Sequence, residues 1–393
     1  MPTDTIDVNR RWWVLALLGL SRISLGFQFQ TMGSTSEPIA AELGLNYAEI
    51  GTLIGLFMLP GLFLALPAGF ASRYASDRVI LGGSLALLGV GGAIAALADG
   101  FGLLGLGRIA CGAGFVFSTI YFSKLVADWF TGKELATAMS LTVMTWPLGI
   151  ALGQVGHEWL AANFMWQTAF VVASTYCFAA SLLVLLTYKP PPGLATRAIA
   201  SEWRIPRNEL VLTLLASLVW AFFNAGYIVY LNFAPNVLVT GGYSPLGAAT
   251  VISLGSFTMM LSGAVCGQLA DRTGRNDLIV YICMVTAVLS LLLLPVTSLA
   301  IAVSLLFGLV AMSPAGVIMA LTAEAMAPER RAVSMGVFFM SYFLVAAPAP
   351  AIAGWLYDVT GEPYSAVLFG AVLFTATAVS LKVFRSARRR INV

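Results

Sequence analysis

A single arginine, Arg22, stands in the middle of the first long apolar run of this chain. No other charged residue occurs from Trp12 to Gly33, and a run of this length can cross a bilayer as a helix. At about 1.5 Å per residue, Arg22 would lie about 15 Å from Trp12, near the bilayer centre. A charge at that depth costs at least about 2.5–3.5 kcal/mol, so this residue needs a partner or a function.

The guanidinium group of Arg22 is suited to binding a small anion. It is permanently charged and presents a planar fork of donors that matches a carboxylate, and no Asp or Glu lies near the middle of any predicted span. Gly26, Gln30 and Gly33 follow on the same helical face, small or polar as in a cavity wall. We therefore expect Arg22 and Gln30 to contact a substrate or a coupling anion. The alternative is a structural arginine that bonds to helix carbonyl groups.

A polar and aromatic stripe in the second half of the chain is the expected counterpart of this arginine. Trp220, Asn224 and Tyr227 fall on one face of a helix. We expect Asn224 and Tyr227 to line a substrate cavity, together with Trp146, which precedes Pro147 in the fifth predicted span. The alternative for each of these residues is packing against lipid or against other helices.

These residues belong to twelve apolar segments that make up most of the chain. Of its 393 residues, 59% are hydrophobic and 10% are charged, and the mean hydropathy is +0.89; soluble domains carry about 25% charged residues. The composition therefore indicates an all-α integral membrane protein. The predicted spans cover residues 12–33, 47–70, 78–98, 102–126, 135–158, 166–188, 209–233, 244–270, 277–297, 299–325, 332–355 and 365–385.

The distribution of basic residues predicts the orientation of these spans. Of the 21 Lys and Arg, Arg22, Arg108 and Lys124 fall within spans, and Arg78, Lys382 and Arg385 fall at span ends. The other 15 (21 − 6) lie in the N-terminus, in the alternate loops that begin at Ala71, in the linker between the halves and in the C-terminal tail. Basic loops remain in the cytoplasm. We therefore expect a multi-pass protein of the cytoplasmic (inner) membrane with both termini inside.

A polar stretch with three consecutive prolines, at positions 190–192, divides the chain into two halves. We expect an N-terminal six-helix bundle over residues 1–188, a cytoplasmic linker over 189–208, and a C-terminal six-helix bundle with a cytoplasmic tail over 209–393. The halves repeat, because Gly69 and Gly267 lie 198 residues apart and Asp128 and Glu324 lie 196 residues apart. Parallel six-helix repeats of this kind are typical of transporters whose substrate site lies between the halves.

One loop of this repeat carries the motif of a known family. The run GQLADRTGR, from Gly267 to Arg275, resembles the G-x-L-x-D-R-x-G-R loop of the major facilitator superfamily. Its counterpart in the first half, from Gly69 to Arg73, has Ser72 where that motif has an acidic residue. The resemblance covers essentially the whole chain and implies the major facilitator fold, in which two pseudo-symmetric six-helix bundles work by alternating access.

The resemblance also bears on Arg108. The run RIACGAG that begins there is similar to the R-x-x-x-G-x-G element of the family, which implies a role for Arg108 in proton coupling or in helix packing. The antiporter motif of the family is poorly matched around Pro147. The chain is most similar in character to the cyanate, nitrate/nitrite or organic-anion branches.

Acidic residues at the inner ends of spans four and ten predict a cytoplasmic gate. Asp128 and Glu324 stand next to the loops that bear Arg73 and Arg272. We expect ion pairs that hold the cytoplasmic side closed and break when it opens, with Asp271 pairing near Glu324. The alternative is solvation of these side chains at the membrane surface.

Together these features favour a secondary active transporter, driven by a gradient, for a small solute that we expect to be an anion, with a proton or a counter-substrate as coupling partner. The alternatives are an efflux pump for hydrophobic or drug-like compounds and a non-transporting membrane receptor or assembly subunit. His157, the only histidine, is expected in a structural role at the outer interface, and the four cysteines lie in apolar runs. We therefore expect no metal site, no cofactor, no enzyme activity and no nucleic-acid partner.

Overall fold

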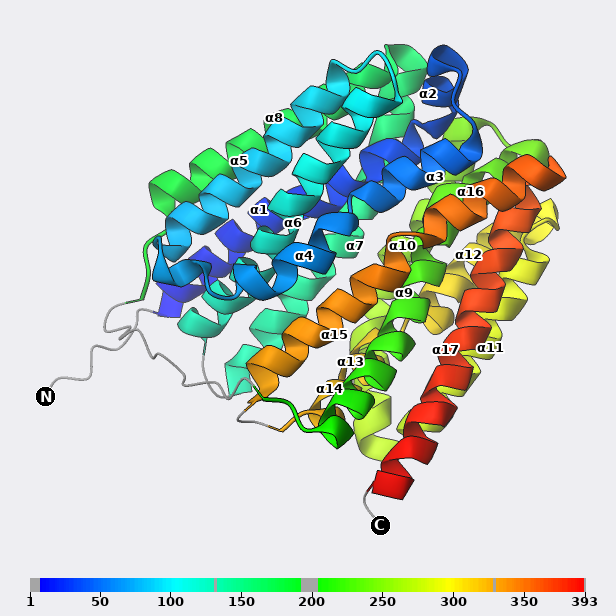
Figure 1. The fold of residues 1–393 in the computed structure, drawn as a ribbon. Helices are drawn as coiled ribbons and strands as arrows, with labels where there is room; N and C mark the ends of the chain where they lie inside the picture. Colours follow the sequence, from blue (N-terminus) through cyan, green and yellow to red (C-terminus); the bar gives the residue numbers. More distant parts are fainter. Residues whose placement is uncertain (1–7, 131–132, 192–203, 328–329, 392–393) are drawn as a thin grey trace, which may run out of the picture.

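The described part of the chain is built from helices. In the computed structural model, which describes residues 8–130, 133–191, 204–327 and 330–391, no strand occurs. Twelve helical segments of these residues are long and apolar enough to cross a membrane, and they stand side by side in an elongated bundle (Figure 1). The all-α integral membrane fold predicted from hydropathy is therefore confirmed.

The first half contributes six of these segments, and the second of them is interrupted. The first segment is extended by a short helix, the second is made of two helices, and a single turn follows it. The elements are α1 (Val8–Ser34), α2 (Ser36–Leu43), α3 (Tyr47–Leu56), α4 (Leu59–Ala68), η1 (Ala71–Arg73), α5 (Asp77–Ala96), α6 (Phe101–Trp129), α7 (Lys133–Asn163) and α8 (Trp166–Thr187).

The second half contributes the other six, and its fourth segment is the least regular. The elements are α9 (Arg207–Thr240), α10 (Pro245–Thr273), α11 (Asn276–Leu293), η2 (Thr297–Leu299), α12 (Ala300–Leu306), the π-helical η3 (Phe307–Ala311), α13 (Ala315–Met319), α14 (Leu321–Ala325), α15 (Arg331–Ala346), α16 (Ala349–Thr360) and α17 (Pro363–Ile391).

The helices of each half pack mainly on one another. In the first half α1 packs on α7 and α8, and α5 packs on α6 and α8; in the second half α17 packs on α9 and α11, and α15 packs on α9. The halves meet where α3 packs on α16, α4 on α15 and α7 on α10 (Figure 1). Most of the expected linker, residues 192–203, lies outside the described residues, so the bounds 189–208 stay a prediction.

Two glycines let α3 approach the second half closely. A Cβ atom at Gly51 would lie 2.0 Å from the carbonyl oxygen of Pro350, and one at Gly55 would lie 2.0 Å from the carbonyl oxygen of Ala347. Small residues four positions apart allow helix backbones to touch in membrane proteins. The halves therefore meet backbone to backbone along this line.

Proline interrupts the eleventh span but not the fifth. Ala347 and Pro348 separate α15 from α16, because proline lacks the N–H that a continuous helix needs. In contrast, α7 continues through Pro147. Span two is also broken, between Leu56 and Leu59, and span ten contains η3; the hydropathy pattern predicts neither feature.

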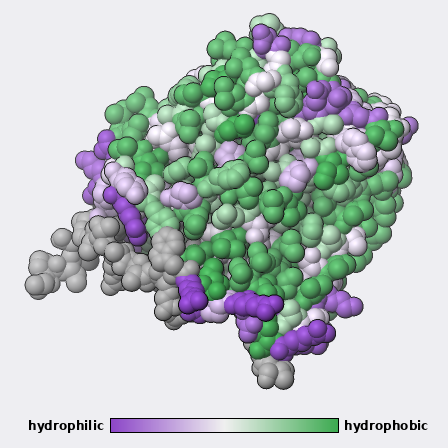
Figure 2. Space-filling view, in the orientation of Figure 1, coloured by the Kyte–Doolittle hydropathy of each residue, from purple (hydrophilic) through white to green (hydrophobic). Residues whose placement is uncertain are grey.

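The two ends of the bundle carry opposite charge. The basic end, where α1 begins and α17 finishes, bears the arginines of the alternate loops, and the acidic end lies opposite. Apolar side chains cover the surface between the ends, where Figure 2 shows few hydrophilic residues. Among the described residues, the acidic end bears no Lys or Arg and seven acids: Glu37, Glu42, Glu49, Asp99, Glu158, Asp358 and Glu362.

Candidate substrate-binding site and gates

Arg22 lies inside the first bundle and binds the backbone of α7. Its side chain is only 8% exposed. Nη1 donates hydrogen bonds to the carbonyl oxygens of Thr142 and Val143, the second at 3.5 Å, and to Oγ1 of Thr145 at 3.1 Å. The carbonyl bonding expected of a structural arginine is therefore present.

Pro147 explains why α7 needs this external donor. Because proline has no N–H, the carbonyl oxygen of Val143, four residues earlier, has no partner within the helix. An unpaired backbone group inside a membrane costs on the order of several kcal/mol. Nη1 of Arg22 supplies the missing donor, and α7 passes Pro147 as one helix.

The other edge of the guanidinium group is free of these bonds. Nε of Arg22 is buried and has no hydrogen-bond partner among the described residues, and Nη2 takes part in none of the three hydrogen bonds of this side chain. Two parallel N–H donors on one edge match the two oxygens of a carboxylate. Arg22 can therefore hold an anion while it supports α7.

Four aromatic rings, three from α1, α6 and α7 and one from the break in span two, form a cluster against which Arg108 packs, 4.7 Å from the ring of Phe57. The ring of Trp146 lies 5.5 Å from that of Phe29 and 5.0 Å from that of Phe115, which is 5.2 Å from the ring of Phe57. Arg22 and Phe29 share a face of α1 because they are seven residues apart, and Trp146 lies one turn beyond the α7 carbonyl groups that Arg22 binds. The sequence analysis singled out Trp146 but missed its three neighbours, because a phenylalanine in an apolar span carries no signal of its own.

Gln30 belongs to a buried amide cluster where α1 crosses α7 and α9. Its Nε2 donates to Oε1 of Gln154 at 2.6 Å and to Oγ of Ser34 at 3.4 Å. Asn232 of α9 faces Gly33 so closely that a Cβ atom there would lie 1.7 Å from Oδ1 of Asn232. Oε1 of Gln30 and Oδ1 of Asn232 are buried without a partner among the described residues. Gln154 and Asn232 are additional candidate site residues that only the crossing of three helices brings together.

Asn224 and Tyr227 lie on α9 and make their hydrogen bonds within the second bundle. Asn224 is half-buried and donates from Nδ2 to the carbonyl oxygen of Trp220 at 2.9 Å. The hydroxyl group of Tyr227 lies 2.8 Å from Oγ of Ser256, and its side chain is buried. Their role as cavity lining stays a prediction.

Arg108 is fully buried and joins α6 to α1 and α3. Its Nε donates to the carbonyl oxygen of Leu53 at 3.1 Å, and its Nη2 donates to that of Phe29 at 3.3 Å. The carbonyl group of Leu53 stands at the end of α3, where the N–H of Phe57 bonds to a different carbonyl group. Of the two roles that the family resemblance implies for Arg108, these contacts favour helix packing.

Polar contacts at the acidic end join the two bundles. Asp358, near the C-terminus of α16, accepts hydrogen bonds from the backbone N–H of Tyr47 at 2.9 Å and from the next N–H at 2.7 Å. The rings of Tyr47 and Tyr357 stack with centroids 3.8 Å apart. Glu37 accepts a hydrogen bond from Nδ2 of Asn236 at 2.8 Å. We call these five residues the acidic-end lock.

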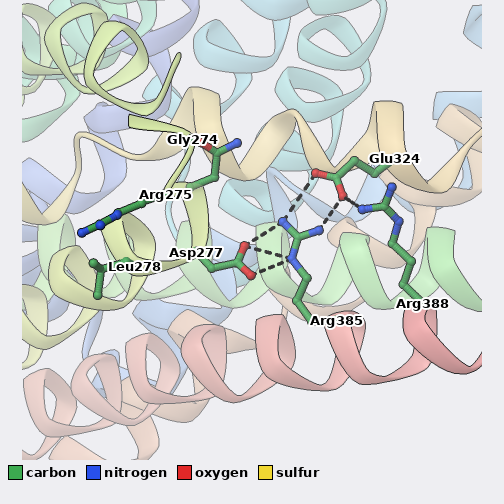
Figure 3. Close-up of a pocket in the computed structure, with 8 residues that line it drawn as sticks. Gly274, Arg275, Asp277, Leu278, Glu324, Arg385 and Arg388 are labelled. Carbon is green, nitrogen blue, oxygen red and sulfur yellow. Dashed lines mark hydrogen bonds and ion pairs between the residues drawn. The ribbon is translucent and has the colours of Figure 1, made fainter. Parts of the chain in front are cut away.

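At the basic end, Glu324 has partners other than those the sequence predicts. It accepts hydrogen bonds from Arg385 and Arg388, which lie about one turn apart on α17 (Figure 3). Asp271 and Arg272 are exposed and make no ion pair within the described part of the chain. In this conformation Glu324 therefore ties α14 to α17 of its own bundle, because the terminal arginines reach it. A latch through Asp271 and Arg272 stays a prediction for another conformation.

Asp128 likewise pairs within its own bundle. Lys124, one turn earlier on α6, lies 3.3 Å from its carboxylate and also binds Asp77. Arg73, which the sequence analysis places next to Asp128, instead lies over the ring of Phe70 at 4.9 Å.

His157 is buried, whereas the sequence analysis places it at the outer interface. Its ring is 0% exposed and lies 4.2 Å from the ring of Phe27, whose carbonyl oxygen is 2.9 Å from Nε2. The position differs from expectation because α7 continues to Asn163, beyond the predicted end at residue 158. No group of three or more His, Cys, Asp or Glu among the described residues could hold a metal ion.

This geometry defines a class of membrane protein: its members have twelve spans arranged in two bundles, and the bundles are in contact at one end. The family model of the Major Facilitator Superfamily matches residues 18–350, and the chain belongs to this family.

Curated relatives and solved structures agree with this assignment. A 3-(3-hydroxy-phenyl)propionate transporter of Escherichia coli (strain K12) is 28% identical over 74% of this chain and 73% of its own length. A cis,cis-muconate transport protein of Acinetobacter baylyi is 24% identical over 93% of this chain and 93% of its own length. These relatives are transporters rather than enzymes.

Two solved structures share the fold. The nucleoside transporter NupG superposes with a TM-score of 0.75 at 12% identity, over 95% of this chain and 98% of that one. A bacterial homologue of the human lysosomal transporter Spinster, in an inward-facing and unoccupied conformation, superposes with a TM-score of 0.70 at 15% identity, over 98% and 97%.

Proposed function

We propose that the protein is a secondary active transporter for a small organic anion. A carboxylate of the substrate would bind the Nε–Nη2 edge of Arg22, and its apolar body would pack against Trp146 and the neighbouring rings. The observation that carries this proposal is that one edge of a buried guanidinium group is bonded to α7 while the other is not. No acidic side chain is among the described hydrogen-bond partners of Arg22, so an anionic ligand would neutralise its charge.

Two relatives support this class of substrate. The proteins from E. coli and A. baylyi are described as transporters of 3-(3-hydroxy-phenyl)propionate and of cis,cis-muconate. Both compounds are small organic acids with a planar, unsaturated part. Such a body suits an aromatic wall, because offset and edge-to-face ring contacts contribute about 0.5–1.5 kcal/mol beyond the area they bury.

The acidic-end lock supports transport by alternating access. Its hydrogen bonds and its ring stack join the two bundles at one end, whereas the described ion pairs of the basic end lie within one bundle. We propose that the basic end faces the cytoplasm and that breaking the lock opens the site to the opposite side. A proton gradient or exchange for a counter-substrate would drive the cycle.

Thermal unfolding of the purified protein tests the choice of substrate. A ligand that binds only the folded state increases the free energy of unfolding, by about 2.7 kcal/mol at a ligand concentration 100 times its Kd, and therefore raises the melting temperature. We expect a shift with 3-phenylpropionate or cis,cis-muconate and none with 3-phenylpropanamide, which has the same body without the charge. Equal shifts with the acid and the amide would refute the anion site.

Uptake into proteoliposomes then separates a transporter from a receptor. The acid with the largest thermal shift should accumulate when a gradient is imposed and should not accumulate in protein-free vesicles. Binding without uptake under any imposed gradient or counter-substrate would indicate a non-transporting receptor. A shift with hydrophobic cations in place of acids would indicate the efflux alternative.

A further inference from the structure

Two cysteines lie at the same level of the hairpin that α10 and α11 form. Cys266 is seven residues (273 − 266) before the end of α10 at Thr273, and Cys283 is seven residues (283 − 276) after the start of α11 at Asn276. At about 1.5 Å per residue, each lies about 10 Å from the turn that joins the helices. Because the two helices run in opposite directions from one short turn, this equal spacing brings the two thiol groups together.

The two thiol groups are in contact in the structure. Cys266 and Cys283 are hydrogen-bond partners of each other, and both contact Ser313, whose Oγ lies 3.5 Å from Sγ of Cys283. Ser313 follows η3 in the irregular tenth span, and its hydroxyl group donates to the carbonyl oxygen of Val310 at 2.7 Å. The two cysteines are only 6% and 4% exposed. Three spans therefore hold two sulfur atoms next to each other in a buried position.

The other two cysteines of the chain have different partners. Cys111 of α6 donates to the carbonyl oxygen of Leu88 at 3.3 Å, and Cys177 of α8 donates to that of Ser24 at 4.0 Å. Helix α5 packs on both α6 and α8, and the described hydrogen bonds include none between these two thiol groups. The backbone therefore holds each of these cysteines separately, whereas Cys266 and Cys283 contact each other.

We propose that Cys266 and Cys283 form a reversible disulfide when the protein meets a hydroperoxide. The sulfur of one cysteine attacks the O–O bond, an S–O bond forms, and an alcohol or water leaves with the thiol proton, which gives a sulfenic acid. The second sulfur then attacks the first, the S–S bond forms, and the S–O bond breaks with release of water. The two sulfur atoms lose two electrons in total and the peroxide gains them, and a thiol reductant restores both thiols.

This disulfide would restrain a helix at which the two halves meet. Helix α10 packs on α7 of the first bundle and also on η3, and a bond to α11 would fix its position beside that π-helical segment. Segments of this kind are frequent at functional sites. In a reducing compartment, disulfides are usually transient and redox-sensing. The pair is thus a redox-sensitive modification site, and it does not depend on which solute the protein carries.

Mass spectrometry of the full chain tests this proposal. The reduced protein in detergent is treated with hydrogen peroxide, the remaining thiols are blocked, and a digest is analysed without reductant. We expect one linked pair of peptides, which contain Cys266 and Cys283. The intact chain should lose about 2 Da, the mass of two hydrogen atoms, and should regain it in dithiothreitol.

Variants of the two pairs provide the control. Cys283→Ala should abolish the loss of mass, and the matched double variant Cys111→Ala/Cys177→Ala should retain it. A gain of about 16 or 32 Da at separate cysteines without a linked pair, an unreacted Cys266, or a link to a cysteine of another helix or chain would overturn the proposal. If a variant does not fold, the peptide map of the wild type still decides, because it identifies the linked cysteines directly.

Discussion

Asp358 caps the first turn of α3 from the opposite bundle, with its carboxylate 2.9 Å from the backbone nitrogen of Tyr47. A carboxylate at a helix N-terminus satisfies backbone donors that have no partner within the helix and interacts favourably with the helix dipole. In most proteins the capping residue belongs to the same helix. Here Asn46 of the same helix caps the N–H of Glu49, and Asp358 of the other bundle accepts from the two N–H groups before it, so separating the bundles at the acidic end removes this second capping contact.

The lock at the acidic end should therefore weaken in Asp358→Ala. Loss of a capping contact costs about 0.5–2 kcal/mol, which would raise the population open at the acidic end about two- to thirtyfold. A cysteine in place of Ser34, which is buried at the end of α1 next to Gly33, the residue that Asn232 of the other bundle faces, should react faster with an impermeant maleimide added from that side. All four native cysteines are buried and give little background.

Glu362→Ala is the matched control for this measurement. It removes an acid from the same end that makes no described side-chain hydrogen bond to the other bundle. Its labelling rate should equal that of the parent protein. An unchanged rate in Asp358→Ala would show that the cap does not hold the bundles together.

Close packing of α3 on the second half should make Gly55→Ala destabilising. The new Cβ atom would lie 2.0 Å from the carbonyl oxygen of Ala347, and overpacking typically costs about 1–3 kcal/mol. Gly83→Ala is the control, because a Cβ atom there meets nothing within 4 Å. That variant should be neutral or more stable by about 0.5–1 kcal/mol. Melting temperatures in detergent compare the two, and equal values would contradict the contact.

Substitution of Arg22 should separate its structural bond from its binding edge. Arg22→Lys keeps the charge and a donor for the α7 carbonyl groups, but an ammonium group cannot present the two parallel donors. We expect a melting temperature near that of the wild type and loss of the acid-induced shift. A wild-type shift in Arg22→Lys would refute the role of the Nε–Nη2 edge.

Arg22→Met tests the other edge. Methionine has no donor, so the carbonyl groups of Thr142 and Val143 would lose the contacts that Nη1 makes. A buried acceptor without a partner costs about 1–3 kcal/mol, and the melting temperature of the unliganded protein should fall accordingly. An unchanged melting temperature would mean that α7 tolerates Pro147 without an external donor.

If the cluster of Trp146 and its three neighbouring rings packs against the substrate, Trp146→Ala should weaken the binding of aromatic acids. Loss of a ring contact of about 0.5–1.5 kcal/mol corresponds to about two- to twelvefold in Kd, and a short aliphatic acid should lose less. Trp159→Ala, on the same helix, removes a tryptophan that is 48% exposed near the acidic end and should leave both affinities unchanged. Equal effects of the two variants would argue against Trp146 as a binding residue.

The existence of the spans was predictable because hydropathy and charge are properties of the chain itself. Twenty apolar residues must form a helix in a bilayer, since no water satisfies the backbone there, and all twelve predicted segments correspond to helical spans. Arg22 and Trp146 were also recognisable, because a lone charge and a tryptophan beside a proline stand out within apolar runs.

Partners of these residues were not predictable, because a partner depends on which helices touch. Spacing places Arg22 on a face of α1, but only the packing of α1 on α7 assigns Nη1 to the carbonyl groups near Pro147. The same holds for Glu324, which binds arginines more than 60 positions later in the chain.

By itself, then, the sequence determined the class of protein, the twelve spans and the separation of charge between the two ends, because each follows from local composition and from the cost of placing polar groups in lipid. Only the tertiary structure decided that Asp358 caps α3 of the other bundle and that His157 is buried. It also decided that one edge of Arg22 is left for a ligand. These features depend on contacts between residues more than 100 positions apart, and such contacts form only when the helices pack on one another.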